Sequence, residues 1–271
     1  MRLREDEVRG GDDMSGARLF AQYAYAPNKL GYCGPAESAT LATAGIDAAH
    51  AAEVDVRAAA RRFSGAWHYL EVLAKLTGID DPLDRRIVES YWLGGGVNEE
   101  ISSTEFGEEL LARIAPEAQH YWAHLTPDLI PEAAGDHGFH VLGVYPWTRF
   151  LGRFGACLAP APPGPTPDHP VQVLDRCRIR WGTVLSRDGE QIVVSAQRLV
   201  WDGTVLSLSE AEQETVAVAV DGLSFLPDVA PGDQVSLHWE WLCDRLSAEQ
   251  VTRLQTSTLS QIEKTNRRLT A

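Results

Sequence analysis

The stretch APAPPGPTPDHP, Ala159 to Pro170, marks the point where the pattern of the whole chain changes. It holds six prolines in twelve residues. Proline lacks the backbone N–H that helix interiors and inner strands need, so this stretch predicts a stiff, extended linker. We therefore expect residues 159–170 to separate two domains of different composition.

The residues before the linker favour helices. Between residues 17 and 158, apolar side chains recur at helical spacing among many Ala, Leu and Glu residues. Helices are expected over six segments: 35–44, 48–64, 67–77, 82–93, 103–114 and 116–125. The charged segment 1–16 predicts a disordered leader. Residues 17–158 are therefore predicted to form a mainly helical domain.

The residues after the linker alternate between apolar and polar, which is typical of strands. Strands are expected within 171–185, 190–203, 204–208, 214–220 and 234–239, with Asp-Gly turns between some of them. Ser247 is expected to cap a final helix that runs to about Arg268. Short strands without intervening helices are typical of a small barrel. The sequence predicts an α+β protein in which residues 171–271 form a β-barrel with a C-terminal helix.

Composition excludes several classes of partner. The formal net charge of −14 argues against nucleic acid, whose phosphates require a basic surface. Apolar runs are too short to cross a bilayer, and the charged N-terminal segment is unlike a signal peptide. The four cysteines, Cys33, Cys157, Cys177 and Cys243, stand far apart, so a disulfide framework is not expected. We therefore expect a cytoplasmic protein that binds neither nucleic acid nor membrane.

The segment that begins at Pro170 resembles the small HypC/HupF-type chaperones of nickel–iron hydrogenase maturation. That family shows a Pro-x-x-Val opening, strands with an internal glycine, a Gly-Asp-x-Val-x-x-His strand and then an acidic helix. The matching residues here are Pro170, Val173, Gly203, Gly232, Asp233, Val235 and His238. The resemblance covers about a third of the chain. It implies a barrel that docks a client, such as a hydrogenase large subunit or another maturation factor.

The resemblance also implies an iron-centred precursor that carries CO and cyanide. The family binds this precursor through a cysteine directly after the initiator methionine, whereas no cysteine stands just before Pro170. Cys177 is expected inside the first strand of the barrel, in a phase that can face its interior. Cys33 is the leading candidate for the thiolate role.

Cys33 lies in the stretch LGYCGPAES, residues 30–38. Because Gly34 and Pro35 precede a predicted helix, the positive end of that helix should lower the pKa of the Cys33 thiol. This setting suits a thiolate that attacks a substrate or binds a metal. A small hydrophobe packed at a helix start is the alternative. Glu37 is expected one turn further on, where it would act as an acid, a base or a ligand, or only favour the helix start.

The Cys-Gly-Pro segment also resembles the nucleophile segment of papain-like cysteine enzymes. In those enzymes a histidine on a later strand acts as the base, and Asp136–Trp147 predicts such a strand with His140, or else His137. The alternative function is therefore a cysteine-dependent hydrolase or acyl transferase with Cys33 as nucleophile and His140 as base. The segment before the linker offers one such strand where that fold needs several.

The histidines suggest a metal site instead. His120 and His124 stand four residues apart, so on an α-helix they would share one face, and His137 and His140 follow. Together with Cys33 they form a ligand set that suits iron, nickel or zinc. Solvated histidines that bind nothing are the alternative.

Further interpretations remain open. The segments GYCGP, YWLG and FHVLGVYPW resemble parts of an uncharacterised actinobacterial family, which implies no activity. A di-metal oxygenase-like bundle usually has two Glu-x-x-His pairs, and only Glu117–His120 is present. A purely structural adaptor is also compatible. An accessory protein of metalloenzyme maturation, in which Cys33 holds or transfers an iron-centred precursor, is preferred because it accounts for both halves of the chain.

Overall fold

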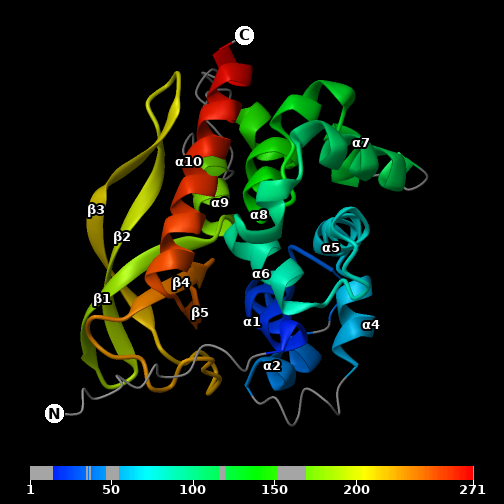
Figure 1. The fold of residues 1–271 in the computed structure, drawn as a ribbon. Coiled ribbons are helices and arrows are strands. Elements are labelled where there is room, and N and C mark those ends of the chain that lie inside the picture. Colours follow the sequence, from blue (N-terminus) through cyan, green and yellow to red (C-terminus); the bar gives the residue numbers. More distant parts are fainter. Residues whose placement is uncertain are drawn as a thin grey trace, which may run out of the picture.

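The computed structural model describes residues 15–34, 36, 38–46, 55–115, 120–151 and 169–270. Helices and a five-stranded antiparallel sheet lie side by side, so the chain is an α+β protein as predicted (Figure 1). The α-helices are α1 (Gly16–Lys29), α2 (Ser38–Ile46), α4 (Val56–Arg61), α5 (Ser64–Thr77), α6 (Arg85–Leu93), α7 (Ser103–Ile114), α8 (His137–Phe139), α9 (His169–Cys177) and α10 (Ala248–Thr270).

Shorter helical turns connect these elements. Within the described residues, four are 3₁₀ helices, η1 (Gly96–Glu100), η3 (His120–His124), η4 (Pro127–Glu132) and η6 (Pro146–Phe150), and η5 (His140–Val144) is a π-helical turn. None of the described helices is both long and apolar enough to cross a bilayer.

Two helix ends follow the sequence closely. Helix α7 begins after Ser102, whose hydroxyl accepts a hydrogen bond from the Glu105 N–H (3.2 Å) while the Glu105 carboxylate accepts one from the Ser102 N–H (3.1 Å). Such reciprocal bonds satisfy N–H groups that the first turn leaves without partners. Helix α5 ends at Gly78, which has a φ of +69° that glycine adopts without steric cost. The predicted leader lies almost wholly outside the described residues.

Helix α1 was not among the expected helices. Residues 19–28 are buried without interruption, so no polar face marks the helix in the sequence, and Pro27 falls in its last turn. Tertiary packing, rather than local pattern, stabilises this segment as a helix.

The strand expected at Asp136–Trp147 is wrong. These residues form α8, η5 and η6, because the Asp136 carboxylate accepts a hydrogen bond from the Phe139 N–H (2.9 Å) and so starts a helix. The continuous burial of residues 139–144 is compatible with a strand or a buried helix, and the cap decides between them.

The first expected strand is also partly wrong. Residues 169–177 form helix α9, and β1 begins only at Arg180. Pro170, Leu174 and Cys177 are buried at a spacing of four and three residues, which is the period of a helix face. Cys177 therefore ends a helix instead of lying inside a strand. The remainder of the predicted linker, 159–168, lies outside the described residues.

The sheet has the strand order β3-β2-β1-β4-β5. Its strands are β1 (Arg180–Asp188), β2 (Gln191–Trp201), β3 (Leu206–Ala217), β4 (Gln234–His238) and β5 (Trp241–Arg245). The hairpin at Asp188-Gly189 is confirmed, since Asp188 pairs with Gln191. Segments 204–208 and 214–220, expected as separate strands, contribute mainly to the single strand β3. Strand β5 was not expected, because only two residues separate it from β4.

Helix α10 lies between the sheet and the other helices (Figure 1). It starts at the predicted cap, where the Ser247 hydroxyl accepts a hydrogen bond from the Gln250 N–H (3.2 Å). Further along, the Ser257 hydroxyl donates to the Asp136 carboxylate (2.6 Å) and the Arg268 guanidinium donates to Glu132 (2.6 Å). The largest hydrophobic cluster accordingly contains residues from both halves of the chain.

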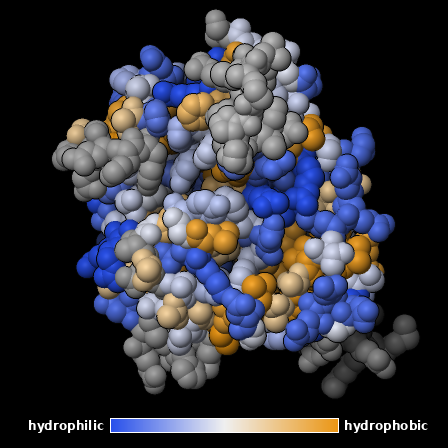
Figure 2. Space-filling model, turned by 180° about the vertical axis from the view of Figure 1, so that it is seen from behind, coloured by the Kyte–Doolittle hydropathy of each residue, from blue (hydrophilic) through white to orange (hydrophobic). Residues whose placement is uncertain are grey.

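The face of the molecule that is seen from behind the view of Figure 1 carries no single dominant apolar area among the described residues. Figure 2 shows hydrophobic patches there that are interrupted by hydrophilic residues. The most unusual group of polar side chains lies inside, where the helices meet the end of strand β4.

Candidate functional site

A small cavity lies where α6, α8, the end of α9 and the end of β4 come together. Its volume is about 10 Å³, close to the minimum that one water molecule or one ion requires. Its lining consists of Pro27, Cys33, Phe63, Gly65, Tyr91, Trp92, His137, His140, Cys177 and His238. Two cysteines and three histidines from distant parts of the sequence therefore surround one enclosed space.

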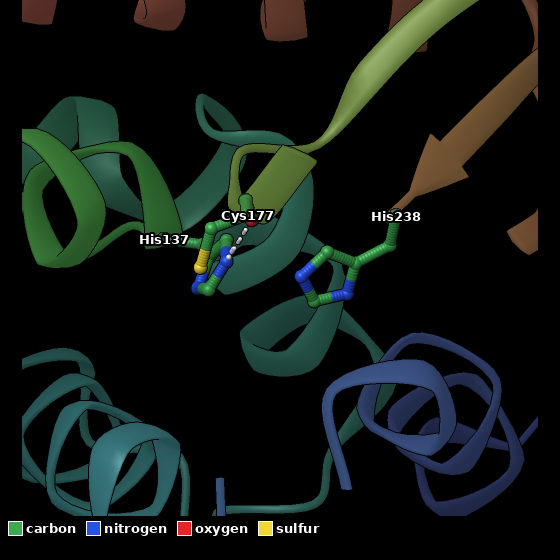
Figure 3. Close-up of side chains that lie close together, drawn as sticks. All are labelled: His137, Cys177 and His238. Carbon is green, nitrogen blue, oxygen red and sulfur yellow. Dashed lines mark hydrogen bonds between the residues drawn. The ribbon is translucent and has the colours of Figure 1, made fainter. Parts of the chain in front are cut away.

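Three of these side chains form a tight group (Figure 3). One ligand atom each of His137, Cys177 and His238 lies within 4.8 Å of the other two, and all three residues are buried. Each stands at the end of an element: His137 begins α8, Cys177 ends α9 and His238 ends β4. Two imidazoles and one thiol are ligands that zinc and iron bind well.

Hydrogen bonds fix the tautomer of both imidazoles. His137 Nε2 lies 2.9 Å from the carbonyl oxygen of Cys177, and His238 Nδ1 lies 2.7 Å from that of Tyr23. A carbonyl oxygen only accepts, so these two nitrogens carry the hydrogens. Burial lowers the pKa of His137 to about 4 and that of His238 to about 3, so both rings are neutral at neutral pH. The second nitrogen of each ring then presents a lone pair.

The two lone pairs differ in their partners. His137 Nδ1 lies 3.2 Å from the Tyr91 hydroxyl, whose one proton is shared between Nδ1 and the Gly65 carbonyl oxygen (3.3 Å). His238 Nε2 is buried and makes no well-formed hydrogen bond among the described residues, although the Cys177 backbone lies near enough to the ring to raise its pKa in part. A buried polar atom without a partner is unfavourable and uncommon. An imidazole that donates one N–H to a backbone carbonyl and keeps its other nitrogen open has the arrangement typical of a metal ligand.

The two cysteines at the cavity are held as thiols. Burial raises the pKa of Cys177 well above its ordinary value, and the nearby Cys33 raises it further. Burial also raises the pKa of the half-buried Cys33, although the Tyr145 hydroxyl, 3.7 Å from its sulfur, lowers it in part. The expected lowering of the Cys33 pKa is wrong, because the effect of burial exceeds any lowering. Pro35 and Glu37 lie outside the described residues.

His140 and Cys33 both line the cavity. The ring centre of His140 is 5.2 Å from that of Tyr145 and 6.0 Å from that of His137. Burial, followed by the proximity of His137, lowers the pKa of His140 well below its ordinary value. The described residues give no hydrogen bond between His140 and the Cys33 sulfur.

The α-helix predicted to carry His120 and His124 is wrong. Both residues belong to the 3₁₀ helix η3, which has three residues per turn, so a spacing of four does not mark one helix face. His124 is half-buried and does not line the cavity; burial, followed by the nearby Arg149, lowers its pKa. The side chain of His120 lies outside the part of the chain that the structure describes.

Two members of the tight group were absent from the predicted ligand set. Cys177 was expected to face the interior of a barrel, and His238 was noted only as part of the Gly-Asp-x-Val-x-x-His motif. The motif was the one signal that pointed to His238. The group forms only because the tertiary structure brings together the three chain segments that carry His137, Cys177 and His238.

No curated protein and no solved structure matches the chain. The model of a family of unknown function, DUF6390, matches residues 12–271. Since this match includes both the helices and the sheet, the chain belongs to the DUF6390 family.

Proposed function

We propose that this protein is an accessory protein of metalloenzyme assembly that holds one transition-metal ion, expected to be iron, in the cavity between its helices and its sheet. His137, Cys177 and His238 would bind the ion, and Cys33 would complete the set from the outer side of the cavity. The observation that carries the proposal is the open, buried Nε2 of His238 beside a thiol and a second oriented imidazole.

The chemistry of these residues suits a metal better than a nucleophile. A bound cation would favour the thiolate forms of Cys33 and Cys177, which burial alone disfavours. The carbonyls of Tyr23 and Cys177 already hold the two imidazoles in the tautomers that a ligand needs. The ion would neutralise part of the charge of the thiolates and orient an exchangeable ligand.

The alternative, a cysteine-dependent hydrolase or acyl transferase, has weaker support. The cavity at Cys33 and His140 has room for about one water molecule, not for an acyl substrate. The raised pKa of Cys33 also opposes attack by its thiolate. A nucleophile of this kind would require a rearrangement of the cavity before each reaction.

The C-terminal resemblance supports a role in maturation. The order of an antiparallel sheet followed by a long helix agrees with a HypC-like module, and His238 is the histidine of the resembling motif. In this proposal the five-stranded sheet and α10 together take the role of the HypC-like module. Two cysteines supplied by the helical part and α9 replace the N-terminal cysteine of the family. The client would be a hydrogenase large subunit or another maturation factor.

Metal analysis tests the proposal directly. Protein purified without oxygen and reconstituted with Fe²⁺ is expected to retain about one ion per chain. Cys177→Ala and His238→Ala should each lose most of it, whereas Cys243→Ala, which removes a buried cysteine that does not line the cavity, should retain it. Circular dichroism of each variant establishes that it is folded.

A second readout keeps the test independent of retention during purification. Cobalt(II) bound to wild-type protein should show thiolate-to-metal charge-transfer absorption that Cys177→Ala loses. Infrared bands of iron-bound CO and cyanide, seen after co-expression with hydrogenase-maturation proteins, would support the maturation role. Folded wild-type protein that binds neither ion would contradict the proposal, and turnover blocked by alkylation of Cys33 would favour the enzyme.

A further inference from the structure

A second cavity, separate from the Cys/His site, opens beside the end of α1. Its volume of about 520 Å³ is in the range of small-molecule sites. Tyr32 and Trp239 line this cleft, whereas their chain neighbours Cys33 and His238 line the Cys/His cavity. The two sites therefore adjoin each other through the same two chain segments, and the cleft has its own chemistry.

The inner wall of the cleft carries an excess of positive charge. Arg180 contacts Glu214 (2.5 Å), and Arg198 bridges Glu214 and Asp175 (3.3 Å to Asp175). Asp175 also pairs with Arg178 (2.9 Å). This network contains three guanidinium groups and two carboxylates, so one positive charge is uncompensated within it. Arg180 is 1% exposed, whereas the side chain of Arg198 is 35% exposed, so Arg198 is the member of the network that a ligand in the cleft reaches.

Two buried donors in the cleft lining have no acceptor. Neither Nε of Arg180 nor Nε1 of Trp239 has a hydrogen-bond partner among the residues that the structure describes. Arg180 uses its other nitrogens on Glu214 and on the Trp239 carbonyl. The wall therefore has more donors than acceptors and one positive charge in excess, and an oxyanion would balance both.

Aromatic rings form the other wall. Tyr32 stacks on Trp239 with ring centres 4.3 Å apart and an interplanar angle of 11°. Tyr32 remains 57% exposed, so much of its surface is open to a ligand. Trp239 has a φ of +57°, a conformation that costs free energy for a residue other than glycine and that places the ring in the turn between β4 and β5.

We propose that this cleft binds a small aromatic oxyanion, a flat ring that bears a carboxylate or a phosphate. The oxyanion faces the guanidinium network, and the ring packs against the aromatic wall. The rim does not change this preference, because its cations Lys29 and Arg176 are each paired with an exposed acidic residue.

Calorimetry on metal-free full-length protein tests the proposal with four probes. AMP combines a ring with a phosphate and anthranilate combines a ring with a carboxylate, whereas adenosine and inorganic phosphate each lack one part. At least one of the two aromatic anions is expected to bind at least about tenfold more tightly than adenosine and inorganic phosphate. Which of them binds identifies the oxyanion.

Matched variants locate the binding. Arg198→Gln, at a partly exposed side chain, and Tyr32→Ala should each weaken binding by about tenfold, and Arg267→Gln on α10 should leave it unchanged. Because the calorimetry uses metal-free protein, failure of the metal proposal would not affect the result. Equal binding of all four probes, or no binding of either aromatic anion, would overturn the proposal.

Discussion

Two histidine side chains show how single hydrogen bonds prepare the candidate metal site. The Tyr23 carbonyl accepts a hydrogen bond from His238 Nδ1–H, and the Cys177 carbonyl accepts one from His137 Nε2–H. Each bond leaves a defined nitrogen for the cavity. The same burial that protects the rings from water also makes their protonation unfavourable.

Acid should therefore destabilise the metal-free protein through these two rings. An imidazole whose pKa is lowered on folding contributes stability above the ordinary value of about 6.5, and loses it as the pH falls toward the folded pKa. With pKa values of about 4 for His137 and about 3 for His238, each ring should lower the free energy of unfolding by about 2 kcal/mol between pH 7 and pH 5. Proton NMR of the metal-free protein should show neither ring titrating above pH 5.

Asp244 works in the opposite direction over the same range. Burial raises its pKa to about 6, so its protonation between pH 7 and pH 5 should increase the free energy of unfolding by about 1 kcal/mol. Unfolding by urea at the two pH values measures the net loss, and Asp244→Asn should make that loss larger. A histidine ring of the pair that titrates near 6.5 in the folded protein would contradict the assigned burial.

Local hydrogen bonds decide where several elements start. The cap at Ser102 starts α7, and the cap at Asp136 turns an apolar segment into a helix that carries His137 into the cavity. The two-residue turn at Trp239 reverses the chain directly after His238. Element ends thus supply all three members of the tight group.

The cap of α7 gives a test at this scale. Ser102→Ala removes the hydroxyl that accepts from the Glu105 N–H and should lower the free energy of unfolding by about 1 kcal/mol. Ser103→Ala, one residue into the same helix, is the matched control and should have little effect. Urea titration measures both, and equal losses would contradict the role of the cap.

Contacts between the two halves stabilise the molecule as a whole. The Tyr23 hydroxyl on α1 lies 2.8 Å from the Ser236 hydroxyl on β4, and both groups are buried. Helix α10 contacts the N-terminal helices on one side and β3 on the other. The described parts of the two halves consequently share one hydrophobic cluster.

Such a shared cluster predicts cooperative unfolding. Differential scanning calorimetry of the metal-free chain is expected to show one transition. Tyr23→Phe, which leaves the Ser236 hydroxyl without this partner, should lower the free energy of unfolding by about 1 kcal/mol and shift that whole transition. Two resolved transitions, of which Tyr23→Phe moves only one, would show that the halves unfold independently.

The sequence by itself determined the class of the fold and much of its local structure. Helical spacing and capping residues predicted α5, α7 and α10, and alternation with Asp-Gly turns predicted the antiparallel strands, because these signals act between residues close in the chain. It also singled out Cys33, His137 and His140 as candidates, and the structure brings them to one cavity.

Only the tertiary structure decided what these residues do together. Helix α1 and the segment at His140 are so continuously buried that local pattern does not distinguish helix from strand. The pKa values of the two thiols also could not be predicted from local sequence. They depend on burial by distant segments rather than on the adjacent helix start. Cys177 and His238 became candidate ligands because α9 and β4 end at the same point in space. That meeting is set by packing across the whole chain, and no local sequence signal records it.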